Sequence, residues 1–71
     1  MKYMVVVEEG PSSWGAYVPD LPGCIAAGDT REEVLELIEE AIAFHLDGLK
    51  ADGQPLPAAH SSSASVEVQA A

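Results

Sequence analysis

The sequence predicts a small α+β domain, in which an antiparallel sheet of order β-β-β-α-β carries one helix on one face. Three observations support this fold class: short β-branched or aromatic runs separated by turn formers, one long amphipathic segment, and a final stretch of alternating polar and apolar residues. A chain of 71 residues is too short to build more than one core. We therefore expect a single domain over residues 1–71, with its core within residues 1–53.

The first two predicted strands form a hairpin. Residues 2–8 have strand composition, residues 9–13 are turn formers, and residues 14–18 resume the strand pattern. Residues 3–7 are all apolar, so the first strand presents apolar atoms on both faces of the sheet, of which one helix covers only one. We expect the other face to be buried by a second copy or by another protein, unless the chain after residue 53 folds back over it.

A stiff bend follows the second strand. Pro19 and Pro22 lack an amide hydrogen and restrict the residues before them. Asp20 stands where a turn favours a side-chain acceptor, and Gly23 is expected in a conformation that a side chain would oppose. A short third strand is expected over residues 24–27.

The helix is predicted to begin after Thr30. Gly28 and Asp29 turn the chain, and the charge of Asp29 favours the helix dipole. Residues 30–33 read Thr-Arg-Glu-Glu, a capping box in which the Thr30 hydroxyl accepts from the Glu33 amide and the Glu33 carboxylate accepts from the Thr30 amide. Gly53 can end the helix in a left-handed conformation. The packing stripe comprises Val34, Leu35, Ile38, Ala41, Ile42, His45, Leu46 and Leu49.

The segment after the helix has two parts. Residues 54–63 are rich in proline and serine, which is typical of a flexible linker. Residues 64–69 are predicted to form a terminal strand, because residues 65–69 alternate polar and apolar side chains.

The charge of the chain indicates its class of partner. Twelve acids against three bases give a net charge of −9, which opposes direct nucleic-acid binding and favours a basic protein as partner. The alternative is that acidity only keeps a small protein soluble. The N-terminus lacks signal-peptide character and no apolar run is long enough for a membrane helix, so the expected location is cytoplasmic.

Two features could contact a partner. Trp14 and Tyr17 are expected on opposite faces of the second strand, so at most one lies in the core and the other is a candidate anchor. Glu32, Glu36 and Glu40 form like-charge pairs four residues apart. This acidic stripe is interpreted either as a solvated helix face or as a surface that attracts a cationic protein.

Chemistry-bearing residues are few. Asp20 and Asp29 could hold a divalent cation or act as acid and base, but a turn and a helix start also explain them. Cys24 is expected to be a buried hydrophobe, His45 a partly buried helix residue, and His60 solvated. We expect no catalytic residue, no metal site and no cofactor.

The run over residues 17–24 (Tyr-Val-Pro-Asp-Leu-Pro-Gly-Cys), followed by Gly-Asp-Thr over residues 28–30 and by two glutamates, resembles the HicB family, the antitoxin half of bacterial toxin–antitoxin pairs. The resemblance implies a domain similar to a partial ribonuclease H-like fold, which oligomerises and masks a small basic HicA-type toxin that degrades mRNA. The candidate partner contacts are Trp14, as an aromatic residue next to the hairpin, together with Tyr17 and Asp20, which match the family pattern. The remaining pattern positions, which look architectural, are Pro19, Pro22, Gly23, Cys24, Gly28, Asp29, Thr30 and Glu33.

Many members of that family carry a further DNA-binding module. Residues 65–71 are too few for one, so operator binding by this chain is not expected. Two alternatives remain open: a solitary homo-oligomeric adaptor with an unrelated partner, and a residual metal-dependent nuclease that uses Asp20 and Asp29.

Overall fold

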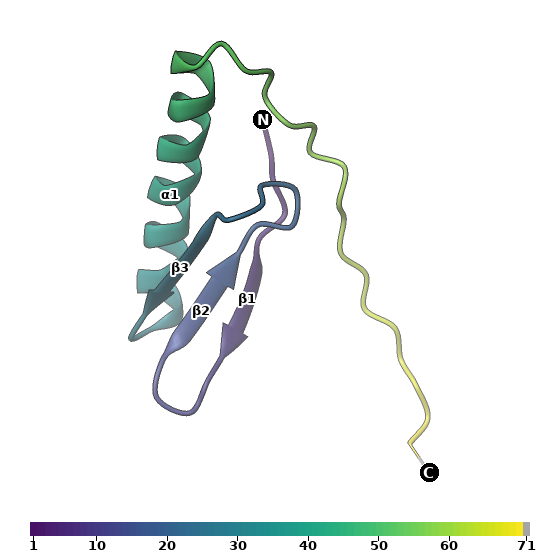
Figure 1. Ribbon diagram of the computed structural model, residues 1–71. Helices are drawn as coiled ribbons and strands as arrows, with labels where there is room; N and C mark the ends of the chain where they lie inside the picture. Colours follow the sequence, from purple (N-terminus) through teal and green to yellow (C-terminus); the bar gives the residue numbers. More distant parts are fainter. Residues whose placement is uncertain (71) are drawn as a thin grey trace.

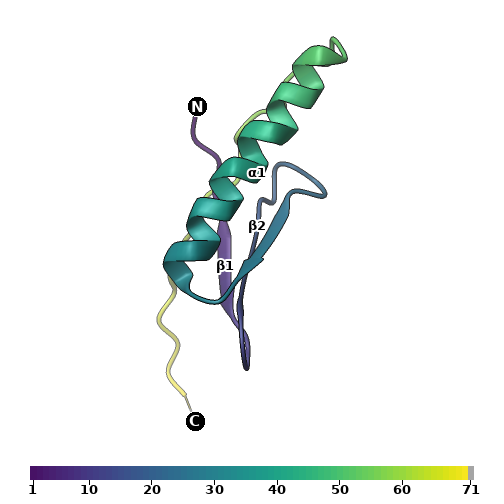
Figure 2. The same ribbon diagram turned by 90° about the vertical axis from the view of Figure 1, so that its left-hand side faces the viewer.

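The computed structural model describes residues 1–70 and contains one three-stranded antiparallel sheet followed by one helix. The elements are β1 (Val6–Glu9), β2 (Trp14–Tyr17), β3 (Ile25–Gly28) and α1 (Arg31–Ala51). The strands lie in the order β1-β2-β3, and α1 packs on one face of the sheet (Figures 1 and 2). The predicted α+β class is therefore confirmed.

The strand register assigns side chains to the two faces of the sheet. Ala16 of β2 lies opposite Ala26 of β3 and Val7 of β1, and these three positions face the helix. The next positions point away from it, and we call this side the outer face. It comprises Val6, Glu8, Gly15, Tyr17, Ile25 and Ala27.

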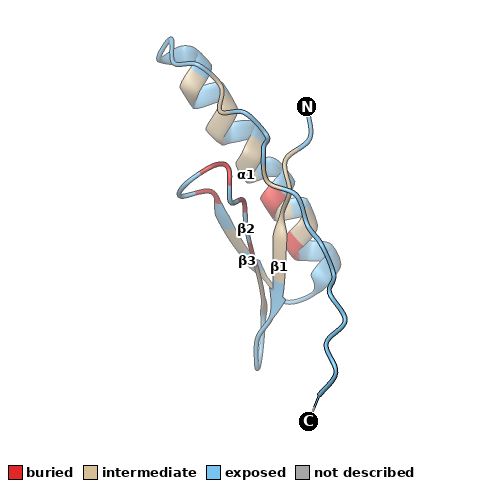
Figure 3. Ribbon diagram, turned by 90° about the vertical axis from the view of Figure 1, so that its right-hand side faces the viewer, coloured by how far each residue is buried: buried red, intermediate tan, exposed pale blue. Residues whose placement is uncertain are grey.

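The core is thin and lies between α1, β2 and the loop that joins β2 to β3 (Figure 3). Partly buried apolar residues of β1 and of the second half of α1 pack around it. Its buried members are Ala16, Val18, Leu21, Cys24, Val34 and Ile38.

The β2–β3 loop is held by its own backbone. The Val18 amide donates to the Cys24 carbonyl at 3.2 Å, the Leu21 amide to the Val18 carbonyl at 3.1 Å, and the Cys24 amide to the Leu21 carbonyl at 3.0 Å. This turn carries the Leu21 side chain into the core, where it is 0% exposed. Gly23 has φ of +85°, the left-handed conformation that the sequence predicted for it. Both prolines of the loop stay at the surface.

The helix has the predicted start and end. The Glu33 amide donates to Thr30 Oγ1 at 3.1 Å, and Gly53, with φ of +69°, follows the C-terminal cap. The second half of the predicted capping box is wrong within residues 1–70, because no bond joins the Glu33 carboxylate to the Thr30 amide. The Glu33 side chain lies over Gly28 instead, so that a Cβ built there would be 3.2 Å from Glu33 Cγ.

The helix is much longer than the strands that it covers. Its 21 residues span about 31 Å, whereas each four-residue strand spans about 13 Å. The second half of α1 therefore extends past the sheet, beside the N-terminal segment (Figure 1). Among residues 1–70, no helix is both long and apolar enough to cross a membrane.

The predicted fourth strand over residues 64–69 is wrong for the single chain. Residues 54–70, which we call the tail, lie outside any helix or strand, and Val66 and Val68 are each 79% exposed. The alternation of side chains is present, but no neighbouring strand pairs with it in this chain. The first strand is also shorter than predicted: β2 ends before Pro19, so residues 2–5 have no strand residue opposite them.

The predicted linker over residues 54–63 is attached to the domain at defined points. The Tyr3 hydroxyl donates to the Pro57 carbonyl, and Leu56 and Pro57 are half-buried. Part of the predicted linker thus contacts the domain, because backbone groups of the tail bond to side chains of the domain.

Candidate partner-binding surface

An apolar row crosses the outer face. Tyr17 lies in the middle, directly opposite Val6 on β1 and Ile25 on β3. Tyr17 is 42% exposed and Ile25 is 71% exposed, so the tail does not cover them. The structure thus confirms that one helix leaves the second face of the sheet open.

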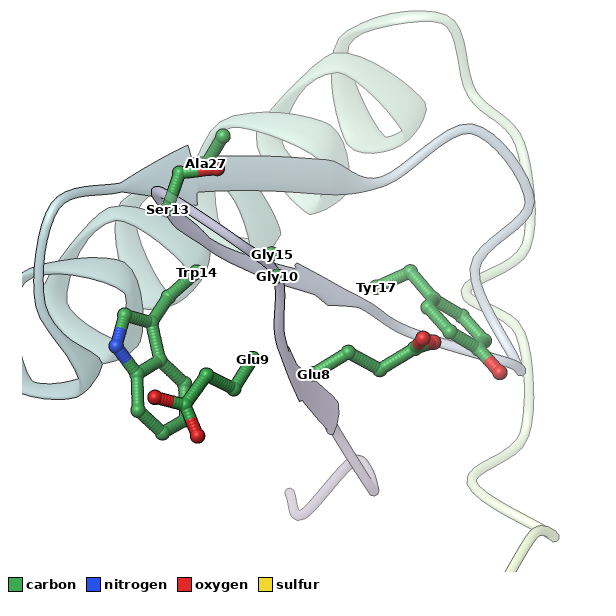
Figure 4. A pocket seen from close by; sticks show the side chains of 8 residues that line it. All are labelled: Glu8, Glu9, Gly10, Ser13, Trp14, Gly15, Tyr17 and Ala27. Carbon is green, nitrogen blue, oxygen red and sulfur yellow. The ribbon is translucent and has the colours of Figure 1, made fainter.

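A shallow depression of about 330 Å³ adjoins this row. Glu8 and Tyr17 line it from the outer face, and Glu9 and Trp14 line its other end (Figure 4). Figure 4 shows the Glu8 carboxylate pointing toward the Tyr17 ring. The apolar row therefore has acidic groups at its border.

The two aromatic residues of β2 have different environments. Trp14 points to the same side of the sheet as Ala16 and packs against the core, where it is half-buried. Tyr17 points to the opposite side and is exposed. Of the two candidates, the structure thus places Tyr17 on the outer face and uses Trp14 partly for packing.

Asp20 is not a surface residue, which corrects its prediction as a partner contact. Its side chain is 1% exposed. Its Oδ2 accepts from the amides of His60 at 3.0 Å and Ser61 at 2.9 Å, and its Oδ1 accepts from the Ser61 hydroxyl at 2.6 Å. We call these three residues the tail clasp. Because every carboxylate oxygen is engaged inside the chain, Asp20 holds the tail and is not available to another protein.

The clasp also affects the chemistry of its members. The hydrogen bond from the Ser61 hydroxyl, followed by the bond from the Ser61 amide, lowers the pKa of Asp20 below its ordinary value, against the opposing effect of burial. The His60 ring is 77% exposed, yet its Nε2 lies 3.1 Å from Asp20 Oδ1. His60 is therefore solvated, as predicted, while its ring also lies beside the Asp20 carboxylate.

Little in the sequence predicts the clasp. Its partners are about 40 residues apart, and an aspartate in a Pro-rich bend is fully explained as a turn residue. The one signal for it is the presence of a carboxylate acceptor, Asp20, in a loop, together with a tail that contains the hydroxyl donors Ser61 to Ser63.

The remaining chemistry-bearing residues are dispersed. Asp29 is exposed after β3, at the end of that strand away from Asp20. Within residues 1–70, no three His, Cys, Asp or Glu side chains are grouped so that they could hold a metal ion. Cys24 is buried as predicted, and burial raises the pKa of its thiol, which disfavours the nucleophilic thiolate. His45 is partly buried, also as predicted. The arrangement gives the nuclease alternative no support.

A second exposed patch lies on the helix. Glu36, Glu39, Glu40 and Ala43 line a depression of about 390 Å³. Phe44, one turn beyond Glu40, is 82% exposed. This patch is acidic and lies on α1, whereas the apolar row lies on the sheet.

Comparisons with known proteins agree on one family. A family model described as "HicB_like antitoxin of bacterial toxin-antitoxin system" matches residues 3–70. The solved structure of a "HicA3 and HicB3 toxin-antitoxin complex" contains a chain with a TM-score of 0.66 and 31% identity, covering 83% of this chain and 72% of that one.

Curated relatives come from diverse sources. A protein of 14.9 kDa from Haemophilus phage HP1 is 40% identical over 57 residues, which are 80% of this chain and 43% of the phage protein. A UPF0150 protein of Synechocystis is 41% identical over 56 residues, 78% of this chain and 71% of that protein. "Antitoxin HicB 2" of Photorhabdus laumondii is 33% identical over 57 residues, 80% of this chain and 41% of that protein. The chain thus spans less than half the length of the phage and Photorhabdus proteins.

Proposed function

Because the chain belongs to the HicB-like antitoxin family, we propose that it is a non-enzymatic antitoxin that binds a small basic HicA-type ribonuclease and masks its RNA-binding surface. The observation that carries the proposal is the uncovered apolar row on the outer face. This function places the protein in the cytoplasm, where the mRNA substrate of such a toxin is found.

The apolar row has the composition of a protein contact. An exposed tyrosine between two aliphatic residues offers a large contact area with few rotatable bonds, and tyrosine is enriched among residues that dominate binding energy. Ile25, at 71% exposed, gains most from burial by a partner. We propose that Tyr17 and Ile25 are the central contacts.

Charge supports a basic partner. A nuclease that binds RNA needs a cationic surface, because lysine and arginine neutralise the phosphate backbone. This chain carries a net charge of −9, and Glu8 and Glu9 border the apolar row. Opposite charges accelerate the encounter and orient the partners. The same charge opposes direct contact with nucleic acid, so inhibition acts on the nuclease and not on its RNA.

Binding to a HicA-type toxin, measured by calorimetry, tests the proposal. Tyr17→Ala combined with Ile25→Asp should weaken binding at least 10-fold, because the centre of the apolar row is lost and a charge is added. Phe44→Ala is the matched control: it also removes an exposed apolar side chain, but from the helix, and should change the dissociation constant less than about 2-fold.

Each outcome has a distinct meaning. If the wild-type chain fails to bind or inhibit toxins of this type, including one encoded beside it, the antitoxin function is wrong. If binding is lost with Phe44→Ala and kept in the double variant, the function stands and the contact lies on the acidic helix patch.

A further inference from the structure

β1 presents a free edge. The sheet order leaves one side of β1 without a neighbouring strand. Free edges are usually protected by charged residues, especially lysine, by proline or by a bulge, because their unpaired backbone groups can pair with another strand. Residues 3–7, which lead into β1 and include its first half, are all apolar and contain none of these, and the charged residues of β1, Glu8 and Glu9, lie at its far end.

An apolar groove runs beside this edge. The helix packs mainly on β3 and β2, so that a hollow of about 400 Å³ remains between α1 and the N-terminal segment that leads into β1. Met1, Tyr3 and Val5 line it on the side of that segment, and Leu35, Ile38, Glu39 and Ile42 line it on the side of the helix. A strand that continues the sheet beside residues 3–7 would direct every second side chain toward this groove.

The tail has the pattern that such a strand requires. Over residues 65–69, Val66 and Val68 have one parity, and Ser65, Glu67 and Gln69 have the other. Both valines are 79% exposed, and the segment is extended but belongs to no sheet within its own chain. Figures 1 and 3 show it leaving the domain after the clasp. One chain therefore carries an unfilled apolar groove and an apolar strand face that nothing covers.

We propose that residues 65–69 of one copy add as a fourth strand beside residues 3–7 of a second copy, along the free edge of its sheet, with Val66 and Val68 in the groove between the N-terminal segment and α1. The exchange is reciprocal, so a closed two-fold dimer satisfies both tails and both edges. The polar side chains of the tail strand then face the outer side, where water solvates Glu67.

The attachment of the tail favours a second copy over its own chain. Tyr3 holds Pro57, and Asp20 holds His60 and Ser61. After Ser61 the tail runs away from the β1 edge of its own chain (Figure 1). The clasp thus fixes where the tail departs and presents residues 65–69 to another molecule.

The exchange is separate from the proposed toxin contact, since it uses the edge of β1 and not the outer face. Light scattering and sedimentation equilibrium of the full chain, over a range of concentrations, measure it. The wild type should form a dimer. Val66→Asp with Val68→Asp should raise the dimer dissociation constant at least about 100-fold, because burial of both valines in each tail is lost.

Ser65→Asp with Gln69→Asp is the matched control. It adds the same charge to the same strand, but at positions whose side chains point away from the groove. The dimer should persist, and its dissociation constant should change less than about 10-fold. Both double variants alter only tail residues outside the core, so circular dichroism should report an unchanged fold for each.

Three results would overturn the proposal. The first is a wild-type chain that stays monomeric at high concentration, including a monomer that buries Val66 and Val68 against its own sheet. The second is a dimer whose dissociation constant is unchanged by Val66→Asp with Val68→Asp. The third is equal weakening by the two double variants, which would indicate charge repulsion without a buried face. Loss of toxin binding in the outer-face variant with an intact dimer bears only on the antitoxin function.

Discussion

Replacing Leu21 with alanine tests whether a loop completes the core. Leu21 is fully buried although it lies in no strand or helix, and three hydrogen bonds of the loop backbone hold it there. Removing a buried leucine side chain costs about 2–5 kcal/mol, and the upper part of this range applies when the surroundings cannot collapse into the cavity. The bonded loop restricts such collapse, so we expect about 3–5 kcal/mol.

This loss is large for a chain of this length. A 71-residue domain has a free energy of unfolding of roughly 4–11 kcal/mol. Leu21→Ala should therefore remove roughly a quarter or more of the stability and lower the Tm by at least about 10 °C. Leu21→Val, a smaller truncation, should give an intermediate loss of about 1 kcal/mol and remains measurable if the alanine variant is unfolded.

Urea unfolding, followed through the fluorescence of Trp14 at one fixed protein concentration, measures these values. Ile25→Ala is the control, because Ile25 is 71% exposed and its truncation should change the free energy of unfolding by no more than about 0.5 kcal/mol. A loss below about 1 kcal/mol for Leu21→Ala, with an unchanged urea dependence, would refute the reasoning that the loop belongs to the core.

Three further tests address the clasp and the backbone. In the wild type, the lowered pKa of Asp20 means that its carboxylate contributes fully to the stability of the clasp at pH values above its ordinary pKa, near 3.9, and that this contribution is lost as the pH falls through the lowered pKa. The NMR signal of the Ser61 amide should therefore titrate at acid pH, and Asp20→Asn should abolish this titration. A Ser61 signal that titrates equally in both proteins would contradict the clasp. Gly23→Ala should lower the free energy of unfolding by about 1–2 kcal/mol because of the positive φ of Gly23, whereas Gly48→Ala within α1 should raise it by about 1 kcal/mol. A Cβ at either site meets no atom within 4 Å, so opposite changes in stability isolate the effect of the backbone angle φ. Changes of the same sign in the two variants would argue against this effect. Thr30→Ala should cost about 1 kcal/mol through loss of the cap, and no change in chemical denaturation would show that the cap bond adds nothing.

Local chemistry explains why much of the fold was predictable. The positive φ of Gly23 and Gly53 and the cap at Thr30 depend on residues within a few positions of each other. The helix stripe and the strand parity depend on simple periodicities, which placed Trp14 and Tyr17 on opposite faces. The open face was also predictable from the sequence. The first strand has apolar side chains on both faces of the sheet, and a single helix covers only one of them.

The remaining features depend on contacts between distant parts of the chain. Asp20 contacts the tail about 40 residues later, and nothing in the bend distinguishes an aspartate that caps a turn from one that holds a segment. The tail strand failed for a related reason. Val66 and Val68 have the correct parity, but strand formation needs a partner edge, and the sequence does not state whether that edge belongs to the same molecule.

Because α1 is longer than the strands it covers, its two halves should differ in amide hydrogen exchange. Amides near Val34 and Ile38 lie over the strands and should exchange with solvent only when the whole domain unfolds. Amides beyond about Phe44 extend past the sheet, beside the N-terminal segment (Figure 1), and should exchange through local fraying. The clasp lies between that helix terminus and the two valines of the tail, so fraying of the helix leaves unchanged the point at which residues 65–69 depart from the domain.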